Sequence, residues 1–141
     1  MNKDLHKARN LLESEGYTCV LCRDEAVYTA TDRGVKPLVA WLDEKADLAG
    51  FSAADKVVGK ATAFLYCLLG VKAVYAHVMS AAAKEVLCGH GIAAECGKQV
   101  EAIINRRGDG PCPFEAAVWE IQDPREALQA IYEKQKQMKI H

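Results

Sequence analysis

The chain has 141 residues, of which 50% are hydrophobic and 26% are charged, and its formal net charge is -1. This length suits a single domain over residues 1–141 with a substantial core, and the apolar content excludes an intrinsically disordered chain. The balanced charge provides no basic field for nucleic acid, and no apolar run reaches the roughly 18–20 residues that span a bilayer, so we expect neither partner.

The first residues predict a helix followed by a β-hairpin. Asn2 is a favourable cap for a helix over 3–15, and Gly16 is typical of the residue that ends one. The segments 17–23 and 26–31 are apolar and rich in strand-forming residues, and a short acidic turn joins them. These two segments therefore predict a pair of antiparallel strands.

Downstream of the hairpin, helical and strand patterns alternate. The predicted elements are a helix over 37–47, a strand over 51–54, a helix over 55–69, a strand over 71–79, a helix over 80–87, a strand over 92–96 and helices that begin at 112 and 123. Alternation after an antiparallel pair predicts an α/β fold, a three-layer α-β-α sandwich around a mixed sheet of about five strands.

The segment 53–60, which reads Ala-Ala-Asp-Lys-Val-Val-Gly-Lys, indicates a functional site. It looks like a short buried strand that runs into a helix beginning at Asp55. Lys56 and Lys60 are four residues apart and would share a face of that helix, near its positive end. Gly59 would cost this helix about 1 kcal/mol relative to alanine. Lysines near the positive end of a helix and a glycine within it both oppose helix formation. Such features are more typical of a functional site than of a segment that only supports the fold.

Two of these residues have alternative interpretations. Asp55 is either an N-cap or a carboxylate that orients a lysine or acts as a base. Gly59 allows close packing of the helix on the sheet or close approach of a ligand, and the sequence does not separate the two.

Paired basic residues stand at three predicted helix starts, where acidic residues are more usual. The pairs are Arg33 with Lys36, Lys56 with Lys60, and Arg106 with Arg107. Helix starts gather at the carboxyl edge of parallel strands, and free N–H groups with lysine or arginine bind anions. We therefore expect a shared anion pocket, although each pair alone is also consistent with a solvated surface.

The segment 105–115 is the second stretch with candidate functional residues. Cys112 opens a predicted helix near two arginines, an environment that lowers the pKa of a thiol, so it is either a nucleophile or a structural thiol. Glu115 is either a proton shuttle or an ordinary first-turn helix stabiliser.

The candidate catalytic residues are Asp55, Lys56, Lys60 and Cys112, and the candidate ligand-binding residues are Arg33, Gly34, Lys36, Gly59, Asn105, Arg106, Arg107, Asp109 and Glu115.

The polar segment 1–7 lacks the apolar stretch of a signal peptide, so we expect a cytoplasmic protein whose six cysteines are reduced. Cys19 and Cys22 have metal-like spacing, but residues three apart in a strand face opposite sides of the sheet. No second pair of this kind follows, and we expect no metal and no cofactor.

The segments 33–37, 54–60 and 104–113 resemble those of an uncharacterised prokaryotic family, of the domain of unknown function 1893 type, which has a cytidine-deaminase-like fold. The similarity runs over nearly the whole chain. True deaminases of this fold open two successive helices with His-x-Glu or Cys-x-Glu and with Pro-Cys-x-x-Cys, which together hold zinc. The corresponding positions here fall near 33–36 and 54–58 and contain no usable zinc triad.

The resemblance therefore implies a pocket at these helix starts and argues against hydrolytic deamination. Pro111, Cys112 and Pro113 look like part of the second zinc motif, but they follow the last predicted strand, and we interpret this as a coincidence of spacing.

We expect the chain to bind a small anionic or nucleotide-like molecule, either as a zinc-independent enzyme or as a non-catalytic sensor. A protein-interaction module is a third alternative. The sequence neither requires nor forbids a homodimer.

Overall fold

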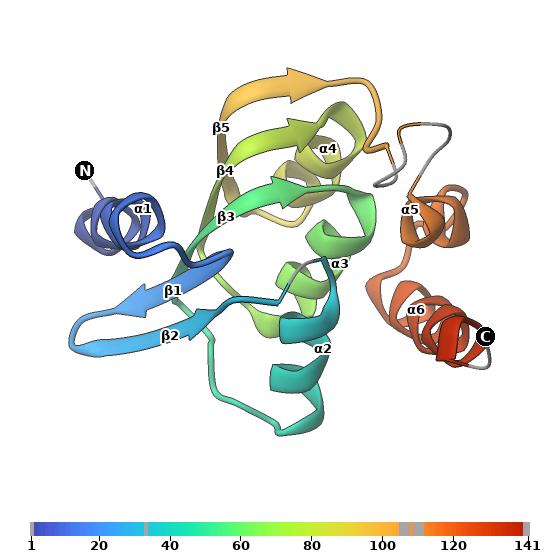
Figure 1. Cartoon of the computed structure of the whole chain (residues 1–141), viewed down its shortest axis with the longest axis horizontal. Helices are drawn as coiled ribbons and strands as arrows, with labels where there is room; N and C mark the ends of the chain where they lie inside the picture. The colour runs from blue at the N-terminus through green and yellow to red at the C-terminus, as the bar shows by residue number, and fades with distance from the viewer. Residues whose placement is uncertain (1, 33, 105–107, 109–111, 140–141) are drawn as a thin grey trace.

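The computed structural model describes residues 2–32, 34–104, 108 and 112–139 of the chain (Figure 1). Within these ranges the elements are α1 (Lys3–Glu15), β1 (Cys19–Arg23), β2 (Ala26–Ala30), α2 (Lys36–Asp43), β3 (Ser52–Val58), α3 (Lys60–Leu69), β4 (Ala73–Ser80), α4 (Ala81–Gly89), β5 (Ala93–Val100), α5 (Pro113–Val118) and α6 (Pro124–Lys139). None of the helices in these ranges has the length and apolar character needed to cross a bilayer.

The strands of the described ranges form one mixed sheet with the order β2-β1-β3-β4-β5. β1 pairs antiparallel with β2 and with β3, whereas β3 with β4 and β4 with β5 are parallel. The carboxyl ends of the three parallel strands point to one side of the molecule, where α3 begins and α5 lies (Figure 1). The prediction of a mixed five-stranded α/β sheet that opens with a hairpin is therefore confirmed.

Helices cover both faces of the sheet. On one face α1 buries Leu5, Ala8 and Leu12 against residues of β1, β3 and β4. On the other face α2, α3 and α4 pack over the larger core, and α6 and α5 pack against α3 on the side away from α4. Helix α3 is thus buried between the sheet and the C-terminal helices.

The predicted first helix and its caps are confirmed. The side chain of Asn2 accepts a hydrogen bond from the N–H of Leu5 at 3.0 Å, which satisfies one of the free donors at the helix start. Gly16 adopts the left-handed conformation at φ 73°, a backbone geometry that glycine reaches without steric cost.

The predicted boundary between strand and helix in the segment 53–60 is wrong. β3 continues through Asp55 to Val58, and α3 begins only at Lys60. The extension has a physical cause, because Val57 and Val58 continue the parallel ladder with Val78 and Met79 of β4, and β-branched residues favour strands. The site residues of this segment therefore do not share a helix.

Two other boundaries also differ from the predictions. α2 ends at Asp43 instead of near Asp47, and Lys45 then adopts a left-handed backbone at φ 57°. β5 runs over Ala93–Val100 instead of ending at Cys96, since its last residues pair with the end of β4. Both differences reflect long-range pairing and local turn geometry more than helix or strand propensity.

Candidate functional site

The start of α3 binds the side chain of Glu115, which comes from α5. The N–H of Lys60 donates to Oε1 of Glu115 at 2.7 Å, and the N–H of Ala61 donates to Oε2 at 2.8 Å. The first N–H groups of a helix have no partners within the helix, and they carry its positive partial charge. Glu115 is 4% exposed, so its carboxylate is a buried anion held by the two donors.

The side chain of Lys60 makes a reciprocal contact with the other end of α5. Its ammonium group donates to the carbonyl oxygen of Trp119 at 2.6 Å, and it lies 5.8 Å from the centroids of the Phe64 and Trp119 rings. Lys60 is 8% exposed. α5 therefore supplies an anion to the start of α3 and receives a cation from it.

Gly59 precedes α3 and does not interrupt it. Its φ of -99° is accessible to any residue, so backbone freedom is not the reason for glycine at this position. A Cβ atom placed here would lie 2.5 Å from Oε1 of Glu115, far inside van der Waals contact. Glycine at this position thus gives a carboxylate room to approach the helix start.

Asp55 belongs to a separate buried cluster on the sheet. The hydroxyl of Tyr66, from the middle of α3, donates to Oδ2 of Asp55 at 2.7 Å, and Sγ of Cys19 lies 3.1 Å from the same hydroxyl oxygen. Burial raises the pKa of Asp55 to about 6, and hydrogen bonds from Tyr66 and from the local backbone oppose this increase. Burial also raises the pKa values of Cys19 and Tyr66, so only Asp55 in this cluster titrates near neutral pH.

The expectation that Asp55 caps a helix is therefore wrong, because the residue lies within β3. Lys56 is exposed on the same strand, and its side chain does not share a helix face with Lys60. Tyr66 and Cys19 were not identified from the sequence. Their partnership with Asp55 depends on the length of β3 and on the rotation of α3 over it, neither of which a local pattern specifies.

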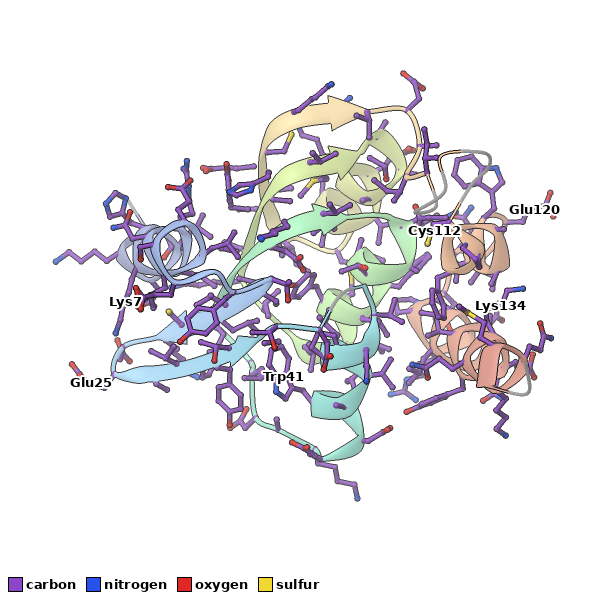
Figure 2. All side chains as sticks on the ribbon, in the orientation of Figure 1. Lys7, Glu25, Trp41, Cys112, Glu120 and Lys134 are labelled. Atoms are coloured by element: carbon purple, nitrogen blue, oxygen red, sulfur yellow. The ribbon has the colours of Figure 1, made fainter. Side chains whose placement is uncertain are left out.

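The other candidate residues lie in different environments. Lys36 begins α2, is 73% exposed and pairs with Asp32 at 3.9 Å, while Gly34 adopts a left-handed backbone in the preceding turn. Cys112 is half-buried at the residue before α5, as expected, on the side of that helix toward the rest of the fold (Figure 2). The remaining predicted site residues, Arg33, Asn105, Arg106, Arg107 and Asp109, lie outside the described residues.

Comparison with known proteins identifies the family. The model of a domain of unknown function, DUF1893 (TM1506), matches residues 7–135. This chain belongs to the DUF1893 family. A solved structure of a DUF1893 family protein, TM1506 from Thermotoga maritima, has a TM-score of 0.86 and 25% sequence identity, and the match covers 95% of this chain and 92% of that one. No curated protein matches the chain. The predicted membership of the DUF1893 family is confirmed, and the description of that family is a domain of unknown function.

A hollow of about 610 Å³ lies beside α5 in this DUF1893 chain. The residues that line it are Ala102, Ile103, Glu115, Ala116, Ala117, Trp119, Glu120 and Ile121. Most of these side chains are apolar, and Trp119 is 51% exposed. The hollow therefore offers apolar surface next to the residue whose carboxylate binds the start of α3.

In the part of the chain that the structure describes, no three His, Cys, Asp or Glu side chains are grouped closely enough to hold a metal ion. Cys19 and Cys22 pack in the cores on opposite faces of the sheet, as the strand alternation predicts.

Proposed function

We propose that this DUF1893 chain is a cytoplasmic ligand-binding domain that holds the anionic group of a small, nucleotide-like molecule at the start of α3. One observation carries the proposal, namely that the N–H groups of Lys60 and Ala61 already hold a buried carboxylate. Two N–H donors at the start of a helix recognise phosphate or carboxylate oxygens.

The surroundings of this anion position support an organic ligand. The apolar hollow beside α5 is next to Glu115, and the exposed ring of Trp119 at its rim is suited to stack on a planar group. A nucleoside monophosphate combines both features, with a phosphate for the helix start and a base for the hollow. The sheet order and the alternation of helices and strands also agree with the cytidine-deaminase-like fold that we propose for this family.

Binding without catalysis is the better supported form of the proposal. Asp55 is 8% exposed and its carboxylate is engaged by Tyr66, so a ligand at the surface has little access to it as a base. Lys56 is exposed on β3 and is not combined with Asp55 and Lys60 in one helical site. These placements favour a sensor or binding domain over a zinc-independent enzyme.

The test is a thermal-shift series with inorganic phosphate, nucleoside monophosphates and the matching uncharged nucleosides. A ligand at about 100 times its Kd adds roughly 2.7 kcal/mol to stability, which is easily measured. We expect a saturable increase in Tm with at least one phosphate-bearing compound and none with the nucleosides. Lys60→Met should abolish the increase, and Lys56→Met is the matched control that should retain it. A Lys60→Met variant that responds like the parent, or a parent that responds to no compound, would contradict the proposal.

A further inference from the structure

We infer that Cys19, Tyr66 and Asp55 form a proton-dependent switch, in which protonation of Asp55 reverses the direction of both hydrogen bonds that the Tyr66 hydroxyl makes. The three side chains come from β1, α3 and β3, so the switch joins the buried helix to two strands of the sheet. It uses none of the groups at the start of α3 and does not depend on the proposed function.

The number of hydrogen atoms in the cluster couples its two hydrogen bonds. The hydroxyl oxygen of Tyr66 lies 2.7 Å from Oδ2 of Asp55 and 3.1 Å from Sγ of Cys19, and either atom of the second contact could be the donor. A phenol has one hydrogen and donates it to one neighbour at a time. When Tyr66 donates to an ionised Asp55, the Cys19 thiol must therefore supply the hydrogen of the other bond. The thiol also makes a weaker hydrogen bond to Asp55 itself.

Protonation of Asp55 changes which group needs an acceptor. The added carboxyl hydrogen is buried, and a buried donor requires a partner. The hydroxyl oxygen of Tyr66, at 2.7 Å, is placed to accept it. The phenol hydrogen then turns to Sγ of Cys19, and the thiol changes from a donor into an acceptor. The same three atoms thus support two arrangements that differ by one proton.

The surroundings of Asp55 leave its charge to neutral donors. Its neighbours on the adjacent strands are Cys19 and Ala76, and Tyr66 faces it from α3, while Lys56 beside it on β3 is exposed. None of the ion pairs among the described residues includes Asp55. Burial raises the pKa of Asp55 to about 6, so both arrangements are populated between about pH 5 and about pH 7.

The two arrangements hold α3 on the sheet with different strength. A hydrogen bond to an ionised carboxylate is roughly twice as strong as one between neutral groups, whereas a thiol sulfur is a weak acceptor. The contact of Tyr66 with the sheet should therefore weaken as Asp55 is protonated. The cost of burying the charge has the opposite sign, so the stability of the whole chain falls with rising pH while this contact becomes tighter.

The experiment records the S–H stretching band of Cys19 by Raman spectroscopy, as the difference between the parent and Cys19→Ala, from about pH 5 to about pH 7.5. The band of a thiol moves to lower frequency when the thiol donates a hydrogen bond. We expect this movement as the pH rises, with its midpoint at the pKa of Asp55, about 6. Asp55→Asn cannot titrate and should show a band that is independent of pH.

Cys22 provides the matched control for the thiol. It lies on the same strand and is also buried, but it packs in the core on the other face of the sheet. Cys22→Ala should keep the pH-dependent movement of the parent band, and Cys19→Ala should lose it.

NMR of the aspartate carboxyl carbons provides a second readout, because it follows the titration of Asp55 itself. Tyr66→Phe removes a donor to the ionised form, so the midpoint should rise by about one pH unit. The same variant should lose most of the movement of the Cys19 band. Tyr132→Phe is the matched control, since the Tyr132 hydroxyl also donates to an aspartate but on the surface, and both readouts should equal those of the parent.

Three results would overturn the switch. They are a Cys19 band in the parent that does not move with pH, a movement that persists in Cys19→Ala or Asp55→Asn, and an Asp55 midpoint in Tyr66→Phe that is equal to or below that of the parent. If Asp55→Asn does not fold, Tyr66→Phe decides by both readouts. None of these results bears on phosphate or nucleotide binding, so the switch and the proposed function fail separately.

Discussion

Asp55 contacts the middle of α3 through the hydroxyl of Tyr66, whereas Glu115 contacts the start of the same helix through backbone N–H groups. Both carboxylates are buried, at 8% and 4% exposure. Asp55 has a hydroxyl and the local backbone as donors in a dry environment, and burial raises its pKa to about 6. The Glu115 carboxylate instead has two backbone N–H donors at the positive end of a helix.

The comparison between the two carboxylates shows which environment in this fold stabilises an anion. A carboxylate in the middle of the sheet is tolerated with difficulty, because its few donors compete with the cost of desolvation. The helix start instead provides aligned donors that would be unsatisfied without an acceptor. The first environment is suited to a neutral or proton-sharing group, and the second is suited to an anion, whether a side chain or a ligand.

The largest expected effect on stability comes from removing the carboxylate that binds the start of α3. Glu115→Ala leaves the N–H groups of Lys60 and Ala61 without their acceptor, and we expect a loss of about 3 kcal/mol in the free energy of unfolding. Denaturant titration of Glu115→Ala measures this loss, with Glu120→Ala as the control. Because Glu120 is exposed, its substitution should change the free energy of unfolding by less than about 0.5 kcal/mol. Equal losses in the two variants would show that the helix-start contact contributes nothing specific.

A smaller effect that depends on pH is expected at the sheet cluster. The pKa of Asp55 is raised from 3.8 to about 6, so between these values the native state holds a proton that the unfolded chain has released. The stability that this group contributes therefore falls as the pH rises through that window and is level above it. Tyr66→Phe removes a donor to the ionised carboxylate, so its cost should be about 2 kcal/mol at pH 8 and less than about 1 kcal/mol at pH 5.

Unfolding of Tyr66→Phe at the two pH values is compared with that of Tyr132→Phe. The Tyr132 hydroxyl also donates to a carboxylate, that of Asp43, but this pair is exposed on the surface. Tyr132→Phe should cost less than about 0.5 kcal/mol at both pH values. A cost for Tyr66→Phe that is the same at pH 5 and pH 8 would mean that Asp55 does not change its charge in this range.

The smallest expected effect is at Gly59. Gly59→Ala places a methyl group 2.5 Å from Oε1 of Glu115. The carboxylate is the end of a flexible side chain and can move aside, so we expect a loss of only about 1 kcal/mol. Gly89 is the control, because a Cβ atom there meets nothing within 4 Å, and Gly89→Ala should be neutral or slightly stabilising. Thermal unfolding of the two variants checks this. A neutral Gly59→Ala would mean that the Glu115 contact is not tight.

The parts of the fold that follow local rules were predictable from the sequence. Asn2 and Gly16 stand at the two ends of α1, as helix-capping rules predict. The alternation of helices and strands after the hairpin indicated the mixed sheet. The end of β3 was not predictable, because the residues Asp55 to Gly59 suit both a helix start and a strand. Pairing with β4 decides between these structures, and strand pairing is a property of distant residues.

The contact between the start of α3 and α5 was not predictable from the sequence. The sequence directed attention to Lys60 and Glu115 separately, as a helix-start cation and a first-turn acid. Nothing in their local patterns indicates that one binds the other, because the contact depends on how α5 docks on α3. The same reasoning applies to Tyr66 and Cys19, which have no local feature that distinguishes them from ordinary core residues.

The contact between Lys60 and Glu115 joins residues that are 55 positions apart in the chain. Domains generally fold as units. Because its partner lies so far downstream, the start of α3 obtains its acceptor only after the greater part of the chain has been synthesised.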